Sequence, residues 1–387
     1  MDKTVPAVPE NGTTHAAYVP GLEGVVAAQT RLSHVDGEAG ELLIAGYPVE
    51  GLAPAATFEE VAYLLWHGEG PTPEQLAEFS HALAGQRELP EATMDVLRAA
   101  AIANVPAMDA LRLGAGTLSL SGTAGSADLR AAGLPILAQL PTIVAAYWRL
   151  RQGLEAVAPH PALGHAANYL YMLFGGEPPA ERVRGLETYL NTVVDHGLNA
   201  STFTARVIIS TGSDLVSAVT GAIGALKGPL HGGAPGPALD MVFEIGEASR
   251  AEEVLRAKLG RRERLMGFGH RIYKVRDPRA DVLAAAAERL FRNEADRALY
   301  DLARAVEDVA VRLLAERYPQ HRYKTNVEFY TALLLHGLEL PTELFSPTFA
   351  ISRAAGWIAH CLEQQATKRI IRPQSEYVGE RGKRWAN

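Results

Sequence analysis

The chain has 387 residues, a length that predicts two or three domains or one large domain with an insertion. Hydrophobic residues make up 48% and charged residues 21%, ordinary values for a globular protein that exclude wholesale disorder. Lys and Arg number 37 against 44 Asp and Glu, and the net charge of -7 argues against a protein that wraps nucleic acid. The single cysteine, Cys361, excludes an intramolecular disulfide and a Cys-rich zinc cluster and fits a reducing compartment.

Neither a targeting segment nor a membrane span is predicted. The N-terminal letters MDKTVPAVPENGTT lack the apolar core of a secretory signal and the Arg-rich character of a transit peptide. The most apolar stretch, 134–148, is interrupted by Pro135, Gln139 and Pro141 and falls short of the ~20 apolar residues that a bilayer requires. We therefore expect a cytoplasmic protein.

In chain order, the predicted elements are almost all helices. A short hairpin or strand pair is expected first, over 40–49 (GELLIAGYPV). Helical patterns follow over 59–65, 73–84, 180–194, 213–226, 252–259, 281–318 and 351–366. No repeat of fixed period and no low-complexity block is present. The sequence therefore predicts an all-α, mostly helical protein.

The segment 281–318 has the clearest helical pattern, because it contains neither Gly nor Pro. Its apolar residues recur at alternating three- and four-residue steps and form one face: Leu299, Leu302, Val306, Val309 and Leu313. Its charged residues are predicted to face water: Arg304, Glu307, Asp308 and Arg312. Asp277 and Pro278 suit an N-cap and a first-turn proline at the start of this helix.

Glycine and proline concentrate in two segments, and each segment contains a histidine. In GPLHGGAPGP (228–237), Gly232 and Gly233 let the backbone approach a ligand while the imidazole of His231 projects towards it. A helix that starts near Pro237 would add backbone N–H groups and a positive dipole end, which favour an anionic ligand or a developing oxyanion. A surface turn with an incidental histidine is the alternative.

The second such segment is GFGHRIYKVRDPRAD (267–281), in which Gly267 and Gly269 remove side chains from around His270. Arg279 falls in the first turn of the following helix, where a cation opposes the helix dipole. Its position is therefore easier to explain if it faces an acidic ligand. An ion pair with Asp277 or Asp281 is the alternative.

Glu328 lies among Val327, Phe329 and Tyr330, and this apolar setting predicts partial burial. Burial raises the pKa of a carboxyl group towards the range that suits a general base. A solvent-facing glutamate is the alternative.

Three further polar residues are less distinctive on their own. His196, in VVDHGLNASTF, suits a satisfied structural histidine. Arg353, in ISRAAGW, and Arg372, in RIIRPQSEYVG, each suit a solvated surface group when taken alone.

Taken in the order in which they occur along the chain, these segments resemble the citrate synthase family. The similarity runs from SHVDGEAGELLIAGYPVEGLA through PHPALGHAANYLYML to RPQSEYVG, and the combination of GPLHGGA, GFGHRIYKVRDPRA and TNVEFY at these separations rarely arises by chance. The resemblance implies an almost wholly helical fold: a large domain over 1–226 and 332–387, with a smaller domain inserted over 227–331. It also implies a homodimer whose cleft closes over the substrates.

The implied activity is that of an acyltransferase that condenses acetyl-CoA with oxaloacetate and hydrolyses citryl-CoA to citrate and CoA. By resemblance, His231 hydrogen-bonds the thioester carbonyl, Glu328 takes a proton from the acetyl methyl, and His270 polarises and protonates the ketone. A donor fixed where charge develops supplies roughly 3–4 kcal/mol of transition-state stabilisation.

The resemblance also implies the substrate contacts. His196, Arg279 and Arg353 would hold oxaloacetate, while Arg372 would reach the oxaloacetate of the partner subunit; Arg suits a dianion better than Lys does. Five positions match contacts to coenzyme A: Leu265, Gly267, Gly269, Lys274 and Asn326. No metal or redox cofactor, no nucleic acid and no membrane is implied as a partner.

Two positions depart from the family pattern. The usual base is an aspartate in an NVDFY-like motif, and Glu328 moves the carboxylate by about 1.5 Å if the backbone is unchanged. Where many members have an arginine in a YRGY-like motif, this chain has Ile44-Ala45-Gly46-Tyr47.

Three alternatives remain open at this stage. A 2-methylcitrate synthase would use propionyl-CoA, and one methyl group changes discrimination by only ~1–3 kcal/mol. A catalytically weakened paralogue would bind CoA or a dicarboxylate without turning it over. The basic C-terminal run could form a nucleic-acid or membrane-surface patch, against which the overall charge of -7 counts.

Overall fold

The computed structural model describes residues 18–121, 128–232, 235–270, 272–291 and 294–385. The chain divides into two units. The smaller comprises Met1–Gln29 and Arg372–Asn387, and its described part contains the short 3-10 helix η1 (Pro20–Leu22). The larger, Thr30–Ile371, contains the strands, the α-helices and every candidate site residue except Arg372.

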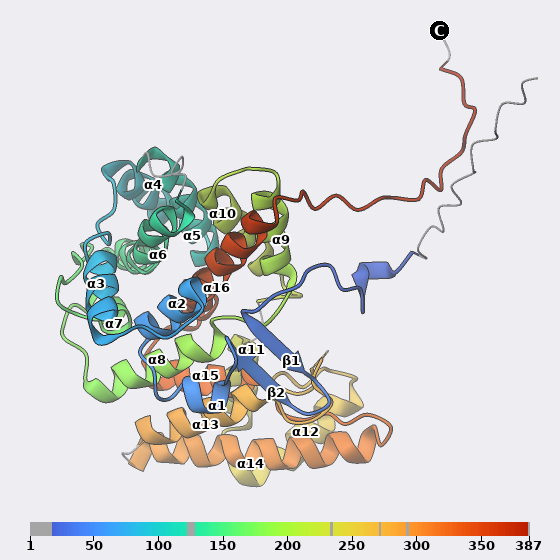
Figure 1. The fold of residues 1–387 in the computed structure, drawn as a ribbon. Helices are drawn as coiled ribbons and strands as arrows, with labels where there is room; N and C mark the ends of the chain where they lie inside the picture. The colour runs from blue at the N-terminus through green and yellow to red at the C-terminus, as the bar shows by residue number, and fades with distance from the viewer. Residues whose placement is uncertain (1–17, 122–127, 233–234, 271, 292–293, 386–387) are drawn as a thin grey trace, which may run out of the picture. The chain divides into compact units, whose positions relative to one another are not determined.

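The larger unit is built almost entirely of helices (Figure 1), which confirms the predicted all-α class. Its α-helices are α1 (Val49–Leu52), α2 (Phe58–His67), α3 (Pro73–Ala84), α4 (Glu91–Ile102), α5 (Ala107–Thr117), α6 (Leu129–Arg151), α7 (His165–Phe174), α8 (Ala180–Val193), α9 (Ala200–Ser210), α10 (Leu215–Leu226), α11 (Pro235–Ile245), α12 (Ala251–Gly260), α13 (Pro278–Leu290), α14 (Glu294–Arg317), α15 (Val327–Gly337) and α16 (Phe345–Thr367). Short 3-10 helices are η2 (Leu118–Ser121), η4 (Ala248–Arg250) and η5 (Thr342–Leu344). Each helical pattern predicted from the sequence falls on an observed helix.

A small antiparallel sheet is formed by β1 (Ser33–Asp36), β2 (Glu41–Ile44) and β3 (Tyr47–Pro48), in that order. The strand pair expected over 40–49 is confirmed as β2 and β3, and β1 adds a strand that was not predicted. The turn between β1 and β2 packs closely against the segment after His270: the main-chain N–H of Lys274 donates to Gly37 O at 2.8 Å. The sheet therefore supports a candidate site segment.

Helix α16 lies in the middle of the helical assembly, packed against α2, α6, α8, α9 and α10 (Figure 1). Trp357 on this helix is fully buried. Gly356 allows the helix to approach the end of α8, since a Cβ atom there would lie 2.3 Å from the carbonyl oxygen of Val194. The close contact requires glycine at this position.

The most apolar stretch of the sequence is part of one continuous helix, α6, which runs through Pro135 and Pro141. The two prolines therefore do not break the helix. Gln139 and Thr142 anchor the helix by donating to the carbonyl oxygens of Glu88 and Arg87 at 2.8 and 3.0 Å. By length and composition α6 is able to cross a membrane, but 83% of its most apolar window is buried inside the protein, as expected of a core helix.

The predicted helix over 281–318 is two helices, because α13 ends at Leu290 and α14 begins at Glu294. Phe291 leaves helical geometry with φ -84° and ψ 72° and is only 2% exposed. Its ring packs against α15 so closely that a Cβ atom on Gly337 would lie 2.9 Å away. Burial of this ring therefore accompanies the break, in a segment without glycine or proline.

Glu307 does not face water as predicted, since its side chain is 3% exposed. Its carboxylate accepts hydrogen bonds from Arg276, Thr325 and Tyr330, and Arg304 Nη1 donates to it at 3.0 Å. Except for Arg304, which is three residues away in the same helix, these donors come from distant segments, so periodicity within the helix did not reveal them. Glu307 ties α14 to the segments on either side of the candidate site.

We expect Gly356→Ala to lower the free energy of unfolding by about 1–3 kcal/mol, the usual cost of overpacking a core. The added methyl group has to push α16 away from the carbonyl of Val194. Gly116→Ala in α5 is the matched control, because Gly116 is exposed and a Cβ atom there meets nothing within 4 Å. Urea unfolding of both variants measures the difference, and equal stability of the two would contradict the close approach.

Candidate active site

Two segments of the candidate site are joined by a short antiparallel bridge. Phe268 pairs with Thr325, the N–H of Gly269 donates to Lys324 O at 2.8 Å, and the N–H of Asn326 donates to Gly267 O at 3.0 Å. Gly267 has φ +85°, and a Cβ atom there would lie 2.8 Å from Phe329. The bridge brings the segment of His270 beside the start of α15, and the glycine is required for it.

Asp277 connects the starts of two helices, although its side chain is completely buried. It caps α13 by accepting from the N–H of Arg279 at 3.1 Å, and its other carboxylate oxygen accepts from the N–H of Val327 at 3.1 Å. It also accepts from Arg279 Nε at 3.0 Å and from Nη2 at 2.8 Å. One carboxylate therefore fixes an arginine and the two helix ends that flank the site.

The ion pair with Asp277 that was the alternative interpretation of Arg279 is thus present, whereas Asp281 pairs with Arg276 instead. The same guanidinium also faces the site, because its Nη2 lies 3.4 Å from His270 Nε2. Its side chain is 4% exposed. Burial opposes its charge, but Asp277 outweighs this effect and raises the pKa of Arg279.

His270 is held in one tautomer by its own loop. Its Nδ1 accepts from the N–H groups of Ile272 and Tyr273 at 3.0 and 3.1 Å, so the ring proton of the neutral form lies on Nε2. Burial, with the neighbouring charge of Arg279, lowers the pKa of His270 to about 4. At neutral pH His270 is neutral, with Nε2–H as its donor; Arg279 Nη2, which is itself a donor, lies 3.4 Å away and does not accept this proton.

His196 is brought to the same place, between α8 and α9. It is 8% exposed, its Nε2 lies 3.2 Å from the hydroxyl of Tyr273, and its ring centre lies 5.9 Å from that of His270. Burial and the charges of Arg279 and Arg353 hold the pKa of His196 well below its usual value. Although its sequence setting suited a structural group, it lies among the other candidates.

His231 lies in the turn after α10, and α11 starts at Pro235, close to the predicted start near Pro237. Its Nε2 accepts from the N–H of Ser201 at 3.3 Å, which leaves the proton of the neutral ring on Nδ1. The hydroxyl of Ser201 lies 2.8 Å from the same nitrogen and accepts from Trp357 Nε1 at 3.1 Å. Burial, aided by Arg353, lowers the pKa of His231 to about 4.

Arg353 is buried within α16, with 2% exposure, so the interpretation as a surface group is wrong for this residue. Its Nε donates to Val193 O at 2.7 Å, and its guanidinium carbon lies 4.5 Å from the centre of the Phe349 ring. Within the described ranges no carboxylate forms an ion pair with it. Burial, with Arg279 nearby, lowers the pKa of Arg353 to about 10, which is the effect of a positive charge that is incompletely neutralised.

Arg372 is exposed and belongs to the smaller unit, so the structure does not place it with the other candidates.

Glu328 is the second residue of α15 and is half-buried, which agrees with its apolar sequence setting. Its N–H donates to the N-cap Asn326 Oδ1 at 3.0 Å. No described residue hydrogen-bonds or ion-pairs with its carboxylate. Burial raises the pKa of Glu328, although the charges of Arg264 and Arg279 oppose this shift.

The remaining candidates surround the bridge. Leu265 and Asn326 are buried, and Asn326 Nδ2 donates to Gly269 O at 2.7 Å. Gly269 has φ +82° and packs against Tyr323. Lys274 is exposed.

Three residues that orient this cluster were not identified from the sequence as site residues: Ser201, Tyr273 and Asp277. For Asp277 the N-cap pattern was visible, but its bond to α15 depends on a contact 50 residues away. For Ser201 and Tyr273 no local pattern distinguishes a site residue from an ordinary polar one.

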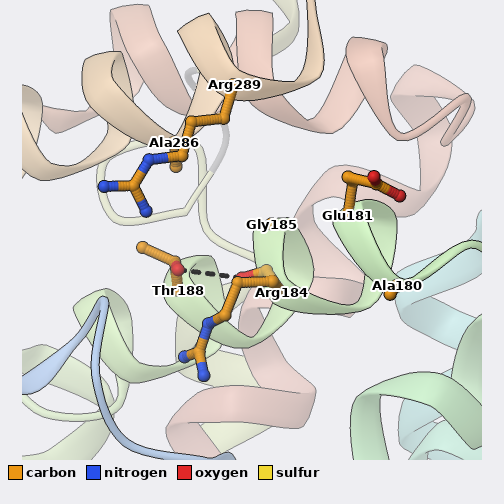
Figure 2. Close-up of a pocket in the computed structure, with 7 residues that line it drawn as sticks. All are labelled: Ala180, Glu181, Arg184, Gly185, Thr188, Ala286 and Arg289. Carbon is orange, nitrogen blue, oxygen red and sulfur yellow. Dashed lines mark hydrogen bonds between the residues drawn. The ribbon is translucent and has the colours of Figure 1, made fainter.

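A cavity of 280 Å³ lies between α8 and α13 (Figure 2) and contains none of the candidates. It is lined by Ala180, Glu181, Arg184, Gly185, Thr188, Ala286 and Arg289. The guanidinium of Arg184 donates to Ala56 O at 2.6 Å and forms an ion pair with Glu187 at 3.1 Å. The Thr188 hydroxyl donates to Arg184 O at 2.8 Å. Across the described part of the chain, no group of three or more His, Cys, Asp or Glu side chains is arranged to hold a metal ion.

Comparison with known proteins agrees with the resemblance. A family model described as citrate synthase, C-terminal domain, matches residues 21–374. A citrate synthase from Haloferax volcanii is 43% identical over 93% of this chain and 96% of its own length, and a 2-methylcitrate synthase from Mycobacterium tuberculosis is 41% identical over 93% and 90%.

Among solved structures, the citrate synthase of Thermoplasma acidophilum, in a ternary complex with carboxymethyl coenzyme A and oxaloacetate, superposes with a TM-score of 0.86. It is 29% identical and the match covers 95% of this chain and 98% of that one. The match of the family model over most of the chain and the identity to curated relatives lead to one conclusion. The chain belongs to the citrate synthase family.

Proposed function

We propose that the cluster around Arg279 and Arg353 condenses acetyl-CoA with oxaloacetate and then hydrolyses citryl-CoA to citrate and CoA. The observation that carries this proposal is a carboxylate without a described partner, Glu328, which is influenced by the charge of Arg279, the arginine beside His270. The pKa values of His270 and His231 lie near 4. An unpaired carboxylate with a raised pKa suits a base, and neutral imidazoles suit hydrogen-bond donors.

In this proposal Glu328 removes a proton from the acetyl methyl group, and Nδ1–H of His231 donates to the enol oxygen as it forms. The methyl carbon then attacks the ketone carbon of oxaloacetate, and Nε2–H of His270 passes its proton to the ketone oxygen. The tautomers derived from Ser201 and from the Ile272 and Tyr273 amides supply both protons on the required nitrogens.

Oxaloacetate would be held by His196, Arg279 and Arg353. A dianion would neutralise the positive charge of Arg353, whose pKa is lowered mainly by burial. Arg372 would contribute from the partner subunit of a homodimer. Coenzyme A would contact Leu265, Gly267, Gly269 and Asn326, with Lys274 as a phosphate partner, and no metal or other cofactor takes part.

The wider organisation is part of the same proposal. The small domain, 227–331, would be inserted between the two parts of the large domain, 1–226 and 332–387. Its movement would close the cleft and exclude water before the condensation. We place the homodimer in the cytoplasm.

Acetyl-CoA is the proposed thioester. Propionyl-CoA is the alternative, since a 2-methylcitrate synthase is 41% identical to this chain. A paralogue that binds oxaloacetate without turnover is the remaining alternative.

Thiol release from acetyl-CoA, with and without oxaloacetate and beside propionyl-CoA, tests the proposal. We expect release that depends on oxaloacetate and is faster with acetyl-CoA. His231→Ala and His270→Ala should each lower kcat by about 10²–10³, the usual cost of losing a transition-state donor. Binding of oxaloacetate without release would support the non-catalytic paralogue, and rates like those of the wild type in either variant would contradict the assigned roles.

We expect Glu328→Asp to keep kcat within about threefold of the unchanged chain or to raise it, because the regular N-cap of α15 leaves the backbone in place for the shorter family residue. Glu328→Gln, the matched control, should lose at least about 10²-fold because it cannot accept a proton. A loss of similar size in both variants would show that the extra methylene is essential.

The dependence of activity on pH follows from the same pKa values. The base form of Glu328 is the carboxylate, so kcat/KM for acetyl-CoA should fall as the pH drops through its raised pKa. His231 and His270 have pKa values of about 4, so their titration should not cause a further change in activity at higher pH. Measurement between about pH 4 and pH 8 checks this; a kcat/KM that does not fall towards the acid end of this range would contradict it.

A further inference from the structure

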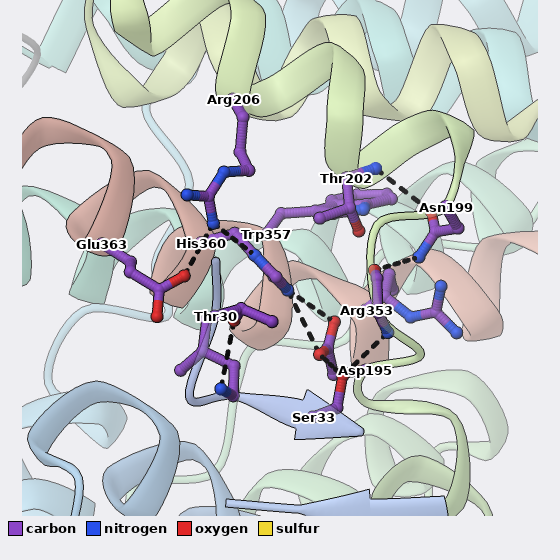
Figure 3. Close-up of polar contacts among 12 residues, drawn as sticks. Thr30, Ser33, Asp195, Asn199, Thr202, Arg206, Arg353, Trp357, His360 and Glu363 are labelled. Atoms are coloured by element: carbon purple, nitrogen blue, oxygen red, sulfur yellow. Dashed lines mark hydrogen bonds and ion pairs between the residues drawn. The ribbon is translucent and has the colours of Figure 1, made fainter. Parts of the chain in front are cut away.

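A buried polar network lies directly behind the candidate site (Figure 3). Its centre is Asp195, which precedes His196 and has no exposed surface. The Asp195 carboxylate accepts from Ser33 Oγ at 2.5 Å, and both of its oxygens lie 3.2 Å from His360 Nε2. Ser33 Oγ in turn accepts from the N–H of Gly197 at 2.8 Å. The two residues that flank His196 are therefore held by one hydroxyl group.

The protonation of His360 follows from its other neighbour. Arg206 Nη1 lies 2.9 Å from His360 Nδ1, and a guanidinium group only donates, so Nδ1 accepts. The proton on Nε2 then points at Asp195. Arg206 is itself fixed by Glu363 Oε2 at 2.7 Å and by Gln364 Oε1 at 3.1 Å. The buried guanidinium of Arg206 thus orients the Nε2–H of His360 towards Asp195.

Arg353 lies on the opposite side of Asp195 from His360 (Figure 3). Each charge favours the ionised form of the other. Asp195 opposes the lowering of the Arg353 pKa by burial, and Arg353 contributes to the lowered pKa of Asp195. Nevertheless, the Nε of Arg353 donates to Val193 O and no ion pair joins it to Asp195. Buried opposite charges normally pair, so something has to keep this pair apart.

We propose that His360 is a positioning residue for oxaloacetate: it holds the Asp195 carboxylate away from Arg353 and so leaves that arginine available to a carboxylate of the substrate. The inference rests on the proposed function, which assigns oxaloacetate to Arg353. Asp195 remains near enough to stabilise the buried guanidinium but does not occupy its free N–H groups. Without the donor on His360, Asp195 turns towards Arg353 and competes with the substrate.

The test is kinetic and uses His360→Leu in two backgrounds. In the unchanged chain, we expect this substitution to raise KM for oxaloacetate by about tenfold, the effect of a charged group competing for one buried contact, with less effect on KM for acetyl-CoA. In an Asp195→Asn background the same substitution should raise KM by less than about threefold, because an uncharged amide competes poorly for a guanidinium. A purely structural role of His360 would raise KM equally in both backgrounds and would overturn the proposal.

Two further variants keep the proposal testable if His360→Leu does not fold, as judged by circular dichroism. His360→Gln can still accept from Arg206 and donate to Asp195, so KM should stay within about threefold of the unchanged chain. Ser33→Ala removes the second restraint and should raise KM for oxaloacetate in the same direction, again only when Asp195 is present. An unchanged KM in Ser33→Ala together with a strongly raised KM in His360→Gln would overturn the proposal.

Failure of the proposed function has a different signature. If the proposed function is wrong, the unchanged protein shows no release of CoA that depends on oxaloacetate. Failure of this inference appears in active variants, as a KM for oxaloacetate that does not depend on whether residue 195 is charged.

Discussion

The candidate site depends on one buried carboxylate, that of Asp277. It caps α13, binds the guanidinium of Arg279 through two nitrogens and accepts the N–H of Val327 at the start of α15. A fully buried carboxylate is costly unless it is paired and hydrogen-bonded, and these four bonds meet that requirement. The consequence is geometric: the arginine beside His270 and the helix that carries Glu328 are held together. The Glu307 network repeats this arrangement one layer further out, since it joins Arg276 and Thr325, the neighbours of Asp277 and Asn326, to α14.

The electrostatic character of the site follows from burial. Arg279 acts on His196 and His270, and Arg353 acts on His196 and His231; together with desolvation, the two arginines suppress protonation of the imidazoles. Positive charge is therefore confined to the guanidinium groups, while the histidines act as neutral donors. Arg279 is balanced by Asp277, whereas Asp195 opposes the lowering of the Arg353 pKa by burial without forming an ion pair with Arg353. Among the described residues Arg353 therefore carries a positive charge that no ion pair neutralises; in our proposal a carboxylate of the substrate binds there, and His360 restrains Asp195.

Much of this arrangement was predictable from local sequence. The helical class follows from apolar periodicity, the strand pair from its hairpin pattern, and the surroundings of His231 and His270 from glycines whose positive φ or close contacts the structure confirms at Gly267 and Gly269. The errors share one cause, which is a partner far away in the sequence. Glu307 is buried because donors from α15 and the Arg276 segment converge on it, and Phe291 leaves the helix because its ring packs against Gly337. Periodicity within one element contains no information on either contact. Taken alone, the segment of Arg353 suited a surface group for the same reason, since the burial of Arg353 depends on packing between α16 and α8.

The glutamate at position 328 can be considered in the light of these constraints. The N–H of Val327 is bound to Asp277 and the N–H of Glu328 to Asn326, so the backbone that leads into Glu328 is held by hydrogen bonds. The bridge between Phe268 and Thr325 holds the preceding residues in the same way.

A shift of about 1.5 Å that would offset the extra methylene of Glu328 is therefore not available from the backbone without breaking several bonds. The side-chain torsions are the remaining soft coordinates, and glutamate has one more of them than aspartate, at an additional cost in conformational entropy when the group is ordered. Half-burial limits the rotamers that the side chain can adopt. If Glu328 is the base, compensation for its extra methylene therefore belongs to its own rotamer.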